Sequence, residues 1–391
     1  MKVLFYIVCF ILILFINCKQ AYTPPAIASP GSYLVVEGVI NNGTDSTIIK
    51  LSNTVNIAST STVNPVFNAT VAVEGDNNIT YLLTETNNGK YFTTNLNLDN
   101  THKYRLTITT SDNKKYYSDY VPVLNSPPID SVFFTISNNQ LNINSTTHDP
   151  TNKVQFYRWD YKQTWIIHSA EISFFKSNGD TVLSRDLVND NIYECWSTDT
   201  SSTVVLKSTS NLEQSIVRDN IITSFPLNSE KVAIRFSIMV SQYALTAEAF
   251  KFWTNLKKNT EKLGGIFDPQ PSEINGNIHC LTNPNEPVIG YLSVGQVANK
   301  RIFISNRQLP QVVPNLSTAT CELDTFWFCR PGTSPPNCEN MVDEYITYNK
   351  YNLGVIIIPI VKVGDIGYLG TSPFCADCTL RGTNRKPDFW K

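Results

Sequence analysis

The sequence predicts a mainly β protein of two β-sandwich-like domains, the second elaborated with one amphipathic helix and a disulfide-rich C-terminal region. Short segments rich in β-branched residues recur at roughly ten-residue spacing, and turn dipeptides such as Asn42-Gly43 and Asn88-Gly89 separate them. Only one stretch, about 246–262, places its apolar residues at helical spacing. These observations together favour a β-sandwich class over a helical or alternating α/β class.

The chain begins with a segment typical of secretory signals. Lys2 precedes an apolar run from Val3 to Ile16, and such segments are removed from the mature protein. This run is shorter than the ~20 residues that a membrane-spanning helix needs. Residues 15–18, Phe-Ile-Asn-Cys, resemble a bacterial lipobox, in which the cysteine is acylated and becomes the first mature residue. We therefore expect residues 1–17 to be a signal peptide and Cys18 to carry lipid; the alternative is a cleaved signal of a soluble secreted protein.

Composition divides the mature chain into three parts. Residues 18–31 contain Pro24, Pro25 and Pro30 and are expected to form an extended tether behind the lipid. Residues 32–123 carry the clearest period-two pattern and predict an Ig-like or transthyretin-like β-sandwich. Two consecutive prolines at 127–128 cannot lie in a central strand, so they mark a boundary. Residues 130–391 are then a β-rich domain with the helix and a Cys-rich tail.

The charge pattern excludes one class of partner. Charged residues make up 16% of the chain, the formal net charge is −2, and the sequence contains no Lys/Arg block. Binding to nucleic acid requires a basic patch that neutralises phosphates, so we expect no nucleic-acid partner. A basic membrane-binding patch is equally unsupported, and attachment to the membrane therefore depends on the lipid anchor.

The cysteines predict an oxidised C-terminal region. In an exported protein such residues form disulfides that stabilise loops with little apolar core. The candidate disulfide cysteines number seven. Because this number is odd, at least one thiol is free or pairs between chains, and the sequence does not select a connectivity. The C-x2-C spacing at 375–378 is also found in zinc half-sites and redox pairs, but no second half-site follows, so we favour a structural role. The candidate disulfide cysteines are Cys195, Cys280, Cys321, Cys329, Cys338, Cys375 and Cys378.

The most aromatic stretch, 154–167, permits two interpretations. Trp159 and Trp165 fall on one face of the predicted strand, together with Tyr157 and Tyr161. An exposed face of this kind would be a stacking platform for sugars, which makes Trp159 and Trp165 a candidate binding surface. We favour the other interpretation, a core-facing stripe, because large aromatic side chains on one face fill the interior of sandwiches.

The predicted helix has clear end signals. Thr246 is a suitable N-cap, Glu248 lies in the first turn, and Gly264 follows the last apolar residue. Its apolar stripe includes Phe252 and Trp253. A single amphipathic helix in a β domain is expected to cover an open sheet face or edge.

The sequence contains no recognisable catalytic, metal or cofactor motif. It lacks G-x-S-x-G, H-E-x-x-H, a P-loop and G-x-G-x-x-G, and its four histidines are scattered. We therefore expect no catalytic residues, metal or cofactor. A hydrolase assembled from carboxylates on distant strands stays open as the minority alternative.

Several motifs together resemble one family. These are the lipobox, the opening 34–38, the loop 267–271 with 275–278, the segment 290–294, and the tail 375–378 with 382–390. The combination is similar to the Bacteroidota family called domain of unknown function 4249 (DUF4249). The resemblance implies an outer-membrane lipoprotein without established activity, often encoded near TonB-dependent receptors.

The expected function is that of a non-catalytic accessory or binding module. The resemblance implies a lipid-anchored protein of the outer membrane that associates with a β-barrel receptor in nutrient uptake, on a membrane face that the sequence leaves undecided. The alternatives are a surface glycan-binding adhesin and a hydrolase. An adhesin would expose Trp159 and Trp165, and a hydrolase would line a pocket with two carboxylates or with a carboxylate and a histidine.

Overall fold

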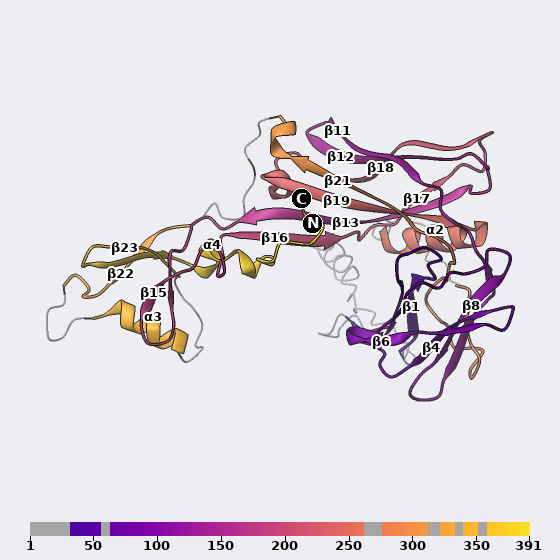
Figure 1. Ribbon diagram of the computed structural model, residues 1–391, viewed down its shortest axis with the longest axis horizontal. Helices are drawn as coiled ribbons and strands as arrows, with labels where there is room; N and C mark the ends of the chain where they lie inside the picture. Colours follow the sequence, from indigo (N-terminus) through magenta and orange to yellow (C-terminus); the bar gives the residue numbers. More distant parts are fainter. Residues whose placement is uncertain are drawn as a thin grey trace, which may run out of the picture.

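The computed structural model describes residues 32–55, 63–261, 276–310, 314, 321–332, 339–350 and 358–391. Within these ranges the protein is mainly β and is elongated, with an N-terminal sandwich and a central sandwich at one end and a distal lobe at the other (Figure 1). The expected fold class is confirmed. No helix in the described ranges is long and apolar enough to cross a membrane. The signal peptide, Cys18 and the tether lie outside the described residues.

The N-terminal sandwich consists of two antiparallel sheets around one apolar core. The first has the order β1-β2-β7-β6, with β3 beside β2: β1 (Leu34–Val39), β2 (Thr47–Asn53), β3 (Asn64–Pro65), β6 (Thr84–Thr86), β7 (Lys90–Thr93). The second has the order β20-β9-β8-β4-β5, with β10 beside β8: β4 (Thr70–Gly75), β5 (Thr80–Leu82), β8 (Lys103–Thr109), β9 (Lys115–Ser118), β10 (Val121–Pro122), β20 (Ile278–Cys280). A short 3-10 turn, Asn87–Gly89, precedes β7. Because successive side chains of a strand point to opposite faces, each of these strands places every second side chain in the core.

A segment far along the chain completes this sandwich. Strand β20 pairs with β9, and residues 288–295 run beside β1 in parallel. The Val36 N–H donates to the Ile289 carbonyl at 2.8 Å, and the Ile40 N–H donates to the Ser293 carbonyl at 3.0 Å. An exposed strand edge invites wrong pairing, and this segment covers the edge of β1. Residues that the sequence placed in the second domain therefore build part of the first core.

The central sandwich packs a three-stranded sheet on a longer sheet. The first has the order β11-β12-β18: β11 (Ile129–Ser137), β12 (Gln140–Asp149), β18 (Ser215–Pro226). The second has the order β16-β13-β19-β21, with β17 beside β13: β13 (Phe156–His168), β16 (Glu194–Thr200), β17 (Val205–Ser208), β19 (Arg235–Leu245), β21 (Ala298–Ser305). Their facing side chains form a second core. Two 3-10 turns, Glu230–Val232 and Asn306–Gln308, flank β19 and β21.

Helix α2 (Ala247–Glu261) is the helix that the sequence predicted. The Ala249 N–H donates to Thr246 Oγ1 at 3.2 Å, which confirms Thr246 as the cap. Phe252 is buried, and the helix contacts β13, β17 and β19, so it covers a sheet face as expected. Position 262, the expected last residue, lies outside the described residues.

The distal lobe contains a hairpin, a small sheet and short helices. The hairpin is β14 (Phe175–Ser177) with β15 (Val182–Ser184), and the sheet has the order β22-β24-β23: β22 (Asp324–Trp327), β23 (Ile358–Val363), β24 (Gly367–Thr371). The helices are α3 (Met341–Lys350), α4 (Pro373–Ala376) and the 3-10 turn Cys378–Leu380. The sequence predicted one helix only. Helix α3 is additional, and its N-terminal amides at Val342 and Asp343 donate to Asn340 Oδ1.

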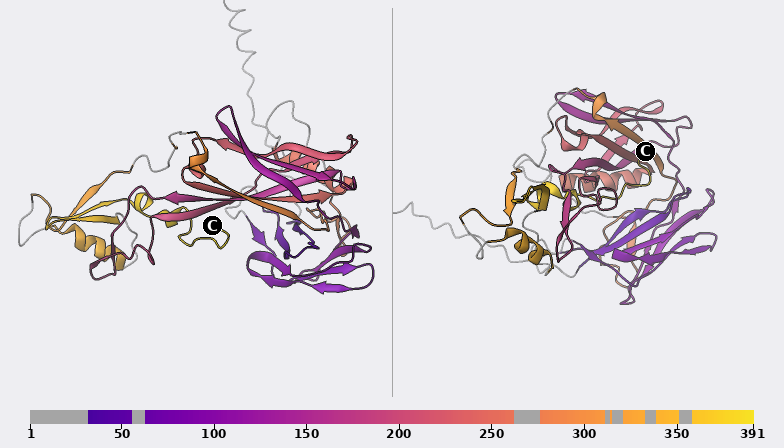
Figure 2. Two further views of the ribbon diagram at one scale, coloured as in Figure 1. Left: turned by 45° about the horizontal axis from the view of Figure 1, so that its top comes forward. Right: turned by 60° about the vertical axis from the view of Figure 1, so that its left-hand side comes forward.

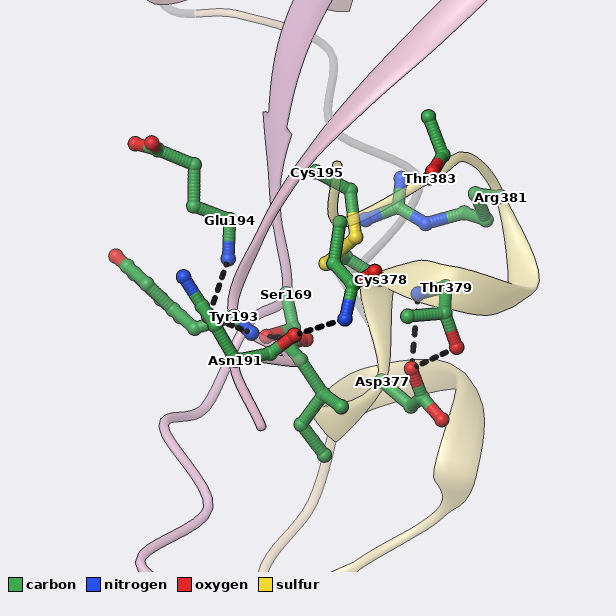
Figure 3. The surroundings of a disulfide bond; sticks show 12 residues. Ser169, Asn191, Tyr193, Glu194, Cys195, Asp377, Cys378, Thr379, Arg381 and Thr383 are labelled. Carbon is green, nitrogen blue, oxygen red and sulfur yellow. Dashed lines mark hydrogen bonds between the residues drawn. A yellow bond between two sulfur atoms is a disulfide. The ribbon is translucent and has the colours of Figure 1, made fainter. Parts of the chain in front are cut away.

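Two disulfides whose cysteines all lie in the described ranges fasten the C-terminal region. Cys195 bonds to Cys378 and Cys321 bonds to Cys375, each with a Cα–Cα distance of 5.7 Å. Figure 3 shows the first, where the Cys378 N–H also donates to the Ile192 carbonyl. The two cysteines of the C-x2-C motif thus belong to different bridges, which leaves neither as a zinc ligand nor as a partner of the other. Cys329 is also disulfide-bonded, and Cys338 lies outside the described residues.

Among the described candidate disulfide cysteines, Cys280 is the one that forms no bridge. It is a free thiol, buried in the N-terminal sandwich at the end of β20, with its sulfur 3.3 Å from Thr282 Oγ1. The odd cysteine count predicted at least one thiol that is free or pairs between chains. Its apolar surroundings suit a free cysteine, which packs as a small hydrophobic side chain.

The last residues of the chain dock on the long sheet of the central sandwich. The Trp390 ring meets Trp196 and Phe303 edge-on, with centroids 6.4 and 5.5 Å away. Arg301 lies over Phe389, with its Cζ 3.6 Å from the ring centroid. The left view of Figure 2 shows the C-terminus beneath this sheet. The tail motif of the sequence therefore has a packing role.

Candidate functional site: a cleft between the two sandwiches

The described residues form a cleft of about 610 Å³ where the N-terminal sandwich meets the outer face of the central sandwich. Strand β1 and the segment beside it form one wall, and β13, β19 and α2 form the other. In Figure 1 these elements meet at the right-hand end of the molecule. Small-molecule sites typically occupy ~300–1,000 Å³ and often lie between domains, so the volume and the place both fit a ligand site.

Arg158 of β13 is the central polar residue of the cleft. Its side chain points away from the sandwich core because it alternates with the core residues Tyr157 and Trp159. The guanidinium lies between two rings, with Cζ 4.2 Å from the Tyr243 centroid and 4.1 Å from the Trp253 centroid. Such cation–π contacts strengthen where water is excluded, and only 8% of Arg158 is exposed.

Arg158 forms an ion pair but leaves one of its donors without a partner among the described residues. Its Nη2 lies 3.1 Å from Asp160 Oδ2, on the same face of β13 two residues later. Its Nε–H is buried and donates to no partner within the described ranges. A buried donor without a partner costs free energy. The site therefore holds a guanidinium in a fixed position at the expense of one unmade hydrogen bond.

Aromatic and aliphatic side chains form most of the remaining lining. Trp253 and Leu256 come from α2, and Tyr291 comes from the segment beside β1. Ile48, on β2 at the cleft, is 51% exposed. Burial, followed by the neighbouring Asp160 carboxylate, raises the pKa of Tyr243 well above its ordinary value. The Tyr243 hydroxyl is therefore protonated at neutral pH and can act as a hydrogen-bond donor.

The candidate surface of Trp159 and Trp165 is not exposed. Trp159 has 0% exposure, and its Nε1–H donates to Gln242 Oε1 at 3.0 Å inside the core. Trp165 is half-buried against the same core, with Lys231 Nζ 5.0 Å from its ring centroid. The core-facing interpretation of this aromatic stripe is thus the one that the structure supports.

Sequence reasoning did not select the residues of the cleft. The alternation in β13 does place Arg158 and Asp160 on the face opposite Trp159, a pattern that also describes an ordinary solvent-facing row. What makes them a site is the packing of Trp253 over Arg158, and these residues are far apart in the chain. The aromatic residues Phe252 and Trp253 in the apolar stripe of the helix were the one available signal.

Each of the four histidines pairs with one carboxylate outside the cleft. The pairs are His102 with Asp76, His148 with Asp130, His168 with Glu194, and His279 with Asp119, at 2.7, 2.8, 3.1 and 3.1 Å. His168 of β13 and Glu194 of β16 are opposite each other, and a cross-strand pair of this type stabilises a sheet modestly. None of the four histidines lines the cleft. Within the described ranges, no group of three or more His, Cys, Asp or Glu side chains is placed to hold a metal ion.

Comparison with known families gives one match over most of the chain. The sequence profile described as "Domain of unknown function (DUF4249)" matches residues 19–301. This range includes both walls of the cleft and ends before the distal sheet and the tail. A comparison with curated proteins finds no match.

Solved structures resemble the chain only loosely. A candidate carbohydrate binding protein from Bacteroides uniformis shares 9% identity and covers 55% of this chain and 91% of its own, with a TM-score of 0.17. The adhesin InvE of Yersinia pseudotuberculosis shares 13% identity and covers 79% of this chain and 72% of its own, with a TM-score of 0.14. Similarity at this level carries no argument about function.

Proposed function

Because this chain belongs to the DUF4249 family, whose description names no activity, we propose a function from the cleft and from the N-terminal sequence. The protein is a non-catalytic binding module of the outer membrane. A lipid on Cys18 holds it there, and it takes up a ligand between its two sandwiches and works beside an outer-membrane β-barrel receptor.

One observation carries the binding role. Arg158 is held between Tyr243 and Trp253 at the wall of a cleft of ligand size, with one donor that has no partner in the described part of the chain. Polar groups placed in an aromatic cleft are typical of small-ligand sites, since they orient a ligand whose affinity comes largely from apolar contact. A side chain fixed before binding also loses little conformational entropy when the ligand arrives.

The receptor is proposed from the lipobox and the family resemblance. Two or more acyl chains at the N-terminus suffice for a stable anchor, and residues 18–31 follow as a proline-containing tether. Because the lipid anchor would hold this protein in the same membrane as the β-barrel, the effective concentration of the two proteins for each other is raised. A weak contact between them is then sufficient for association.

Association with a receptor can be tested in intact cells. A tagged full-length chain is cross-linked, extracted in mild detergent and purified, and its partners are identified by mass spectrometry. We expect an outer-membrane β-barrel receptor with the wild-type chain and none with Cys18→Ser. A monodisperse wild-type chain that brings no barrel with it would refute the accessory role.

A hydrolase is the second candidate, because Glu37 and Asp160 both line the cleft. Each already pairs with a cation: Glu37 with Lys50 and Asp160 with Arg158, both at 3.1 Å. Both carboxylates are thus already engaged by cations, whereas glycoside hydrolysis needs two carboxyl groups that face the substrate and are free to act on it. The geometry therefore favours binding, and ligands recovered intact after long incubation are the expected result.

A further inference from the structure

We propose that the cleft binds a neutral, hydroxyl-rich ligand, specifically a short oligosaccharide, through Arg158, Asp160 and the aromatic wall around Trp253. This inference deepens the proposed binding role and rests on it. It places a saccharide site on the face of β13 opposite Trp159 and Trp165, formed by residues from β13, β19 and α2.

The charges of the cleft argue against an ionic ligand. The charged side chains among its described lining residues are Glu37, Arg158 and Asp160. A small anion approaching the arginine also meets the carboxylate that already pairs with it. A cation approaching that carboxylate meets the fixed guanidinium. Neither sign of charge finds an uncompensated partner, so a neutral ligand fits the site better.

A purely apolar ligand does not fit either. Covering Asp160, whose side chain is 35% exposed, and the outer edge of Arg158 would remove their remaining water contacts. Burial of charged groups without replacement hydrogen bonds costs several kcal/mol, about the gain from burying one or two large apolar side chains. The ligand must therefore bring hydrogen-bonding groups of its own.

Neighbouring hydroxyl groups meet this requirement. The Nη2 of Arg158 is a donor and the Oδ2 of Asp160 is an acceptor, and they lie side by side at 3.1 Å. A hydroxyl both donates and accepts, so two adjacent hydroxyls on a ring can accept from the guanidinium and donate to the carboxylate. Hydrogen bonds to charged groups are also the stronger ones.

The aromatic wall supplies the other half of saccharide recognition. Sugar rings present C–H groups on one face, and aromatic rings carry a negative face that attracts them. Trp253, Tyr243 and Tyr291 line the cleft close to Arg158. One ligand can thus place its C–H face on a ring and its hydroxyl edge on the charged pair.

The test is calorimetric titration of the full-length chain in detergent with maltotriose, cellotriose, mannotriose and chitotriose in turn. We expect at least one to bind with a Kd of about 1 mM or lower. Trp253→Ala and Asp160→Asn should each weaken that binding at least about tenfold. Trp165→Phe, a change on the other face of the same strand, should leave it unaltered.

A second variant keeps the inference testable if Trp253→Ala misfolds. Ile48 is exposed at the cleft, so Ile48→Trp narrows it without entering a core, and we expect loss of binding with an unchanged melting temperature. The inference is overturned if no trisaccharide binds at 10 mM (about ten times the expected Kd). It is equally overturned if binding survives both Trp253→Ala and Ile48→Trp, or if only an uncharged tetrapeptide probe binds. These outcomes are independent of receptor association, which is measured separately.

Discussion

Cys378 forms a disulfide with Cys195, which lies 183 residues earlier in the chain. The bond joins the 3-10 turn after α4 to β16, the edge strand of the long central sheet. Cys375, three residues before Cys378, bonds instead to Cys321. The two bridges therefore fix one short segment to the sheet and to the distal lobe at once.

Removal of the long bridge is expected to destabilise the protein. Replacing both Cys195 and Cys378 by Ala should cost about 2–5 kcal/mol, because the unfolded chain regains the freedom of a large loop. Thermal unfolding of the double variant measures the loss. Cys280→Ala, which removes no bridge, is the control and should shift the melting temperature less. Peptide mapping without reduction should recover Cys195 linked to Cys378; any other pairing would contradict this connectivity.

Gly290 is expected to tolerate no side chain. Its φ is +151°, and a Cβ there would lie 2.3 Å from the Val36 carbonyl oxygen. Gly290→Ala must therefore push the segment 288–295 away from β1, and we expect a loss of about 2–4 kcal/mol. Urea unfolding checks this value. At Gly43 the nearest atom to an added Cβ is a flexible Gln296 carbon at 3.1 Å, so Gly43→Ala should be nearly neutral. Equal losses of stability for the two substitutions would show that the close approach of residue 290 to the Val36 carbonyl does not determine the effect.

Asp149 is expected to make stability depend on acid pH. Burial alone would raise the pKa of Asp149, but hydrogen bonds from the Val154 N–H and from Thr151 outweigh it and hold the pKa below its ordinary value. A carboxyl whose pKa is lower in the folded state contributes stability above its unfolded pKa of about 3.9 and loses it as pH falls through the folded value. Wild type should thus exceed Asp149→Asn in stability at pH 7, and the difference should shrink below about pH 4. Chemical unfolding from about pH 7 down to about pH 2.5 measures it, and a constant difference would exclude this role.

Cys18 is expected to be the only attachment to the membrane. Cys18→Ser should move the chain from the membrane fraction to the soluble fraction, since the lipid cannot be added to serine. Fractionation followed by immunoblotting measures this shift. Protease treatment of intact wild-type cells then tells whether the protein faces the surface. Retention of Cys18→Ser in the membrane would mean that another segment anchors the chain.

Local patterns explain what the sequence predicted well. The cap at Thr246 and the apolar stripe define α2, and alternation in β13 separates Trp159 from Arg158, because both signals depend on neighbours within a few residues. Helix α3 escaped prediction since it is short, with Asn340 as its main start signal. The cap and stripe of α2 and the alternation in β13 can therefore be predicted without information about the rest of the fold.

Long-range pairing explains what the sequence did not predict. Nothing in 276–296 signals that it leaves the second domain and joins β1 and β9, because its short apolar segments would fit either core. The cleft could not be predicted from the sequence for the same reason. Arg158, Tyr243 and Trp253 become a site only when α2 folds back across β13, which depends on tertiary contacts and not on local pattern.

The segment that covers β1 also sets the order of events during synthesis. The N-terminal sandwich lacks β20 and the cover of its edge until residue 295 has been made, although β1 is complete at residue 39. At ~5–20 residues per second, this wait lasts on the order of ten to fifty seconds. For that time the edge of β1 is open to a second nascent chain. Folding of the N-terminal sandwich is therefore delayed until residue 295 of the 391 has been made, and a truncation before residue 288 would leave an aggregating fragment and not a stable N-terminal domain.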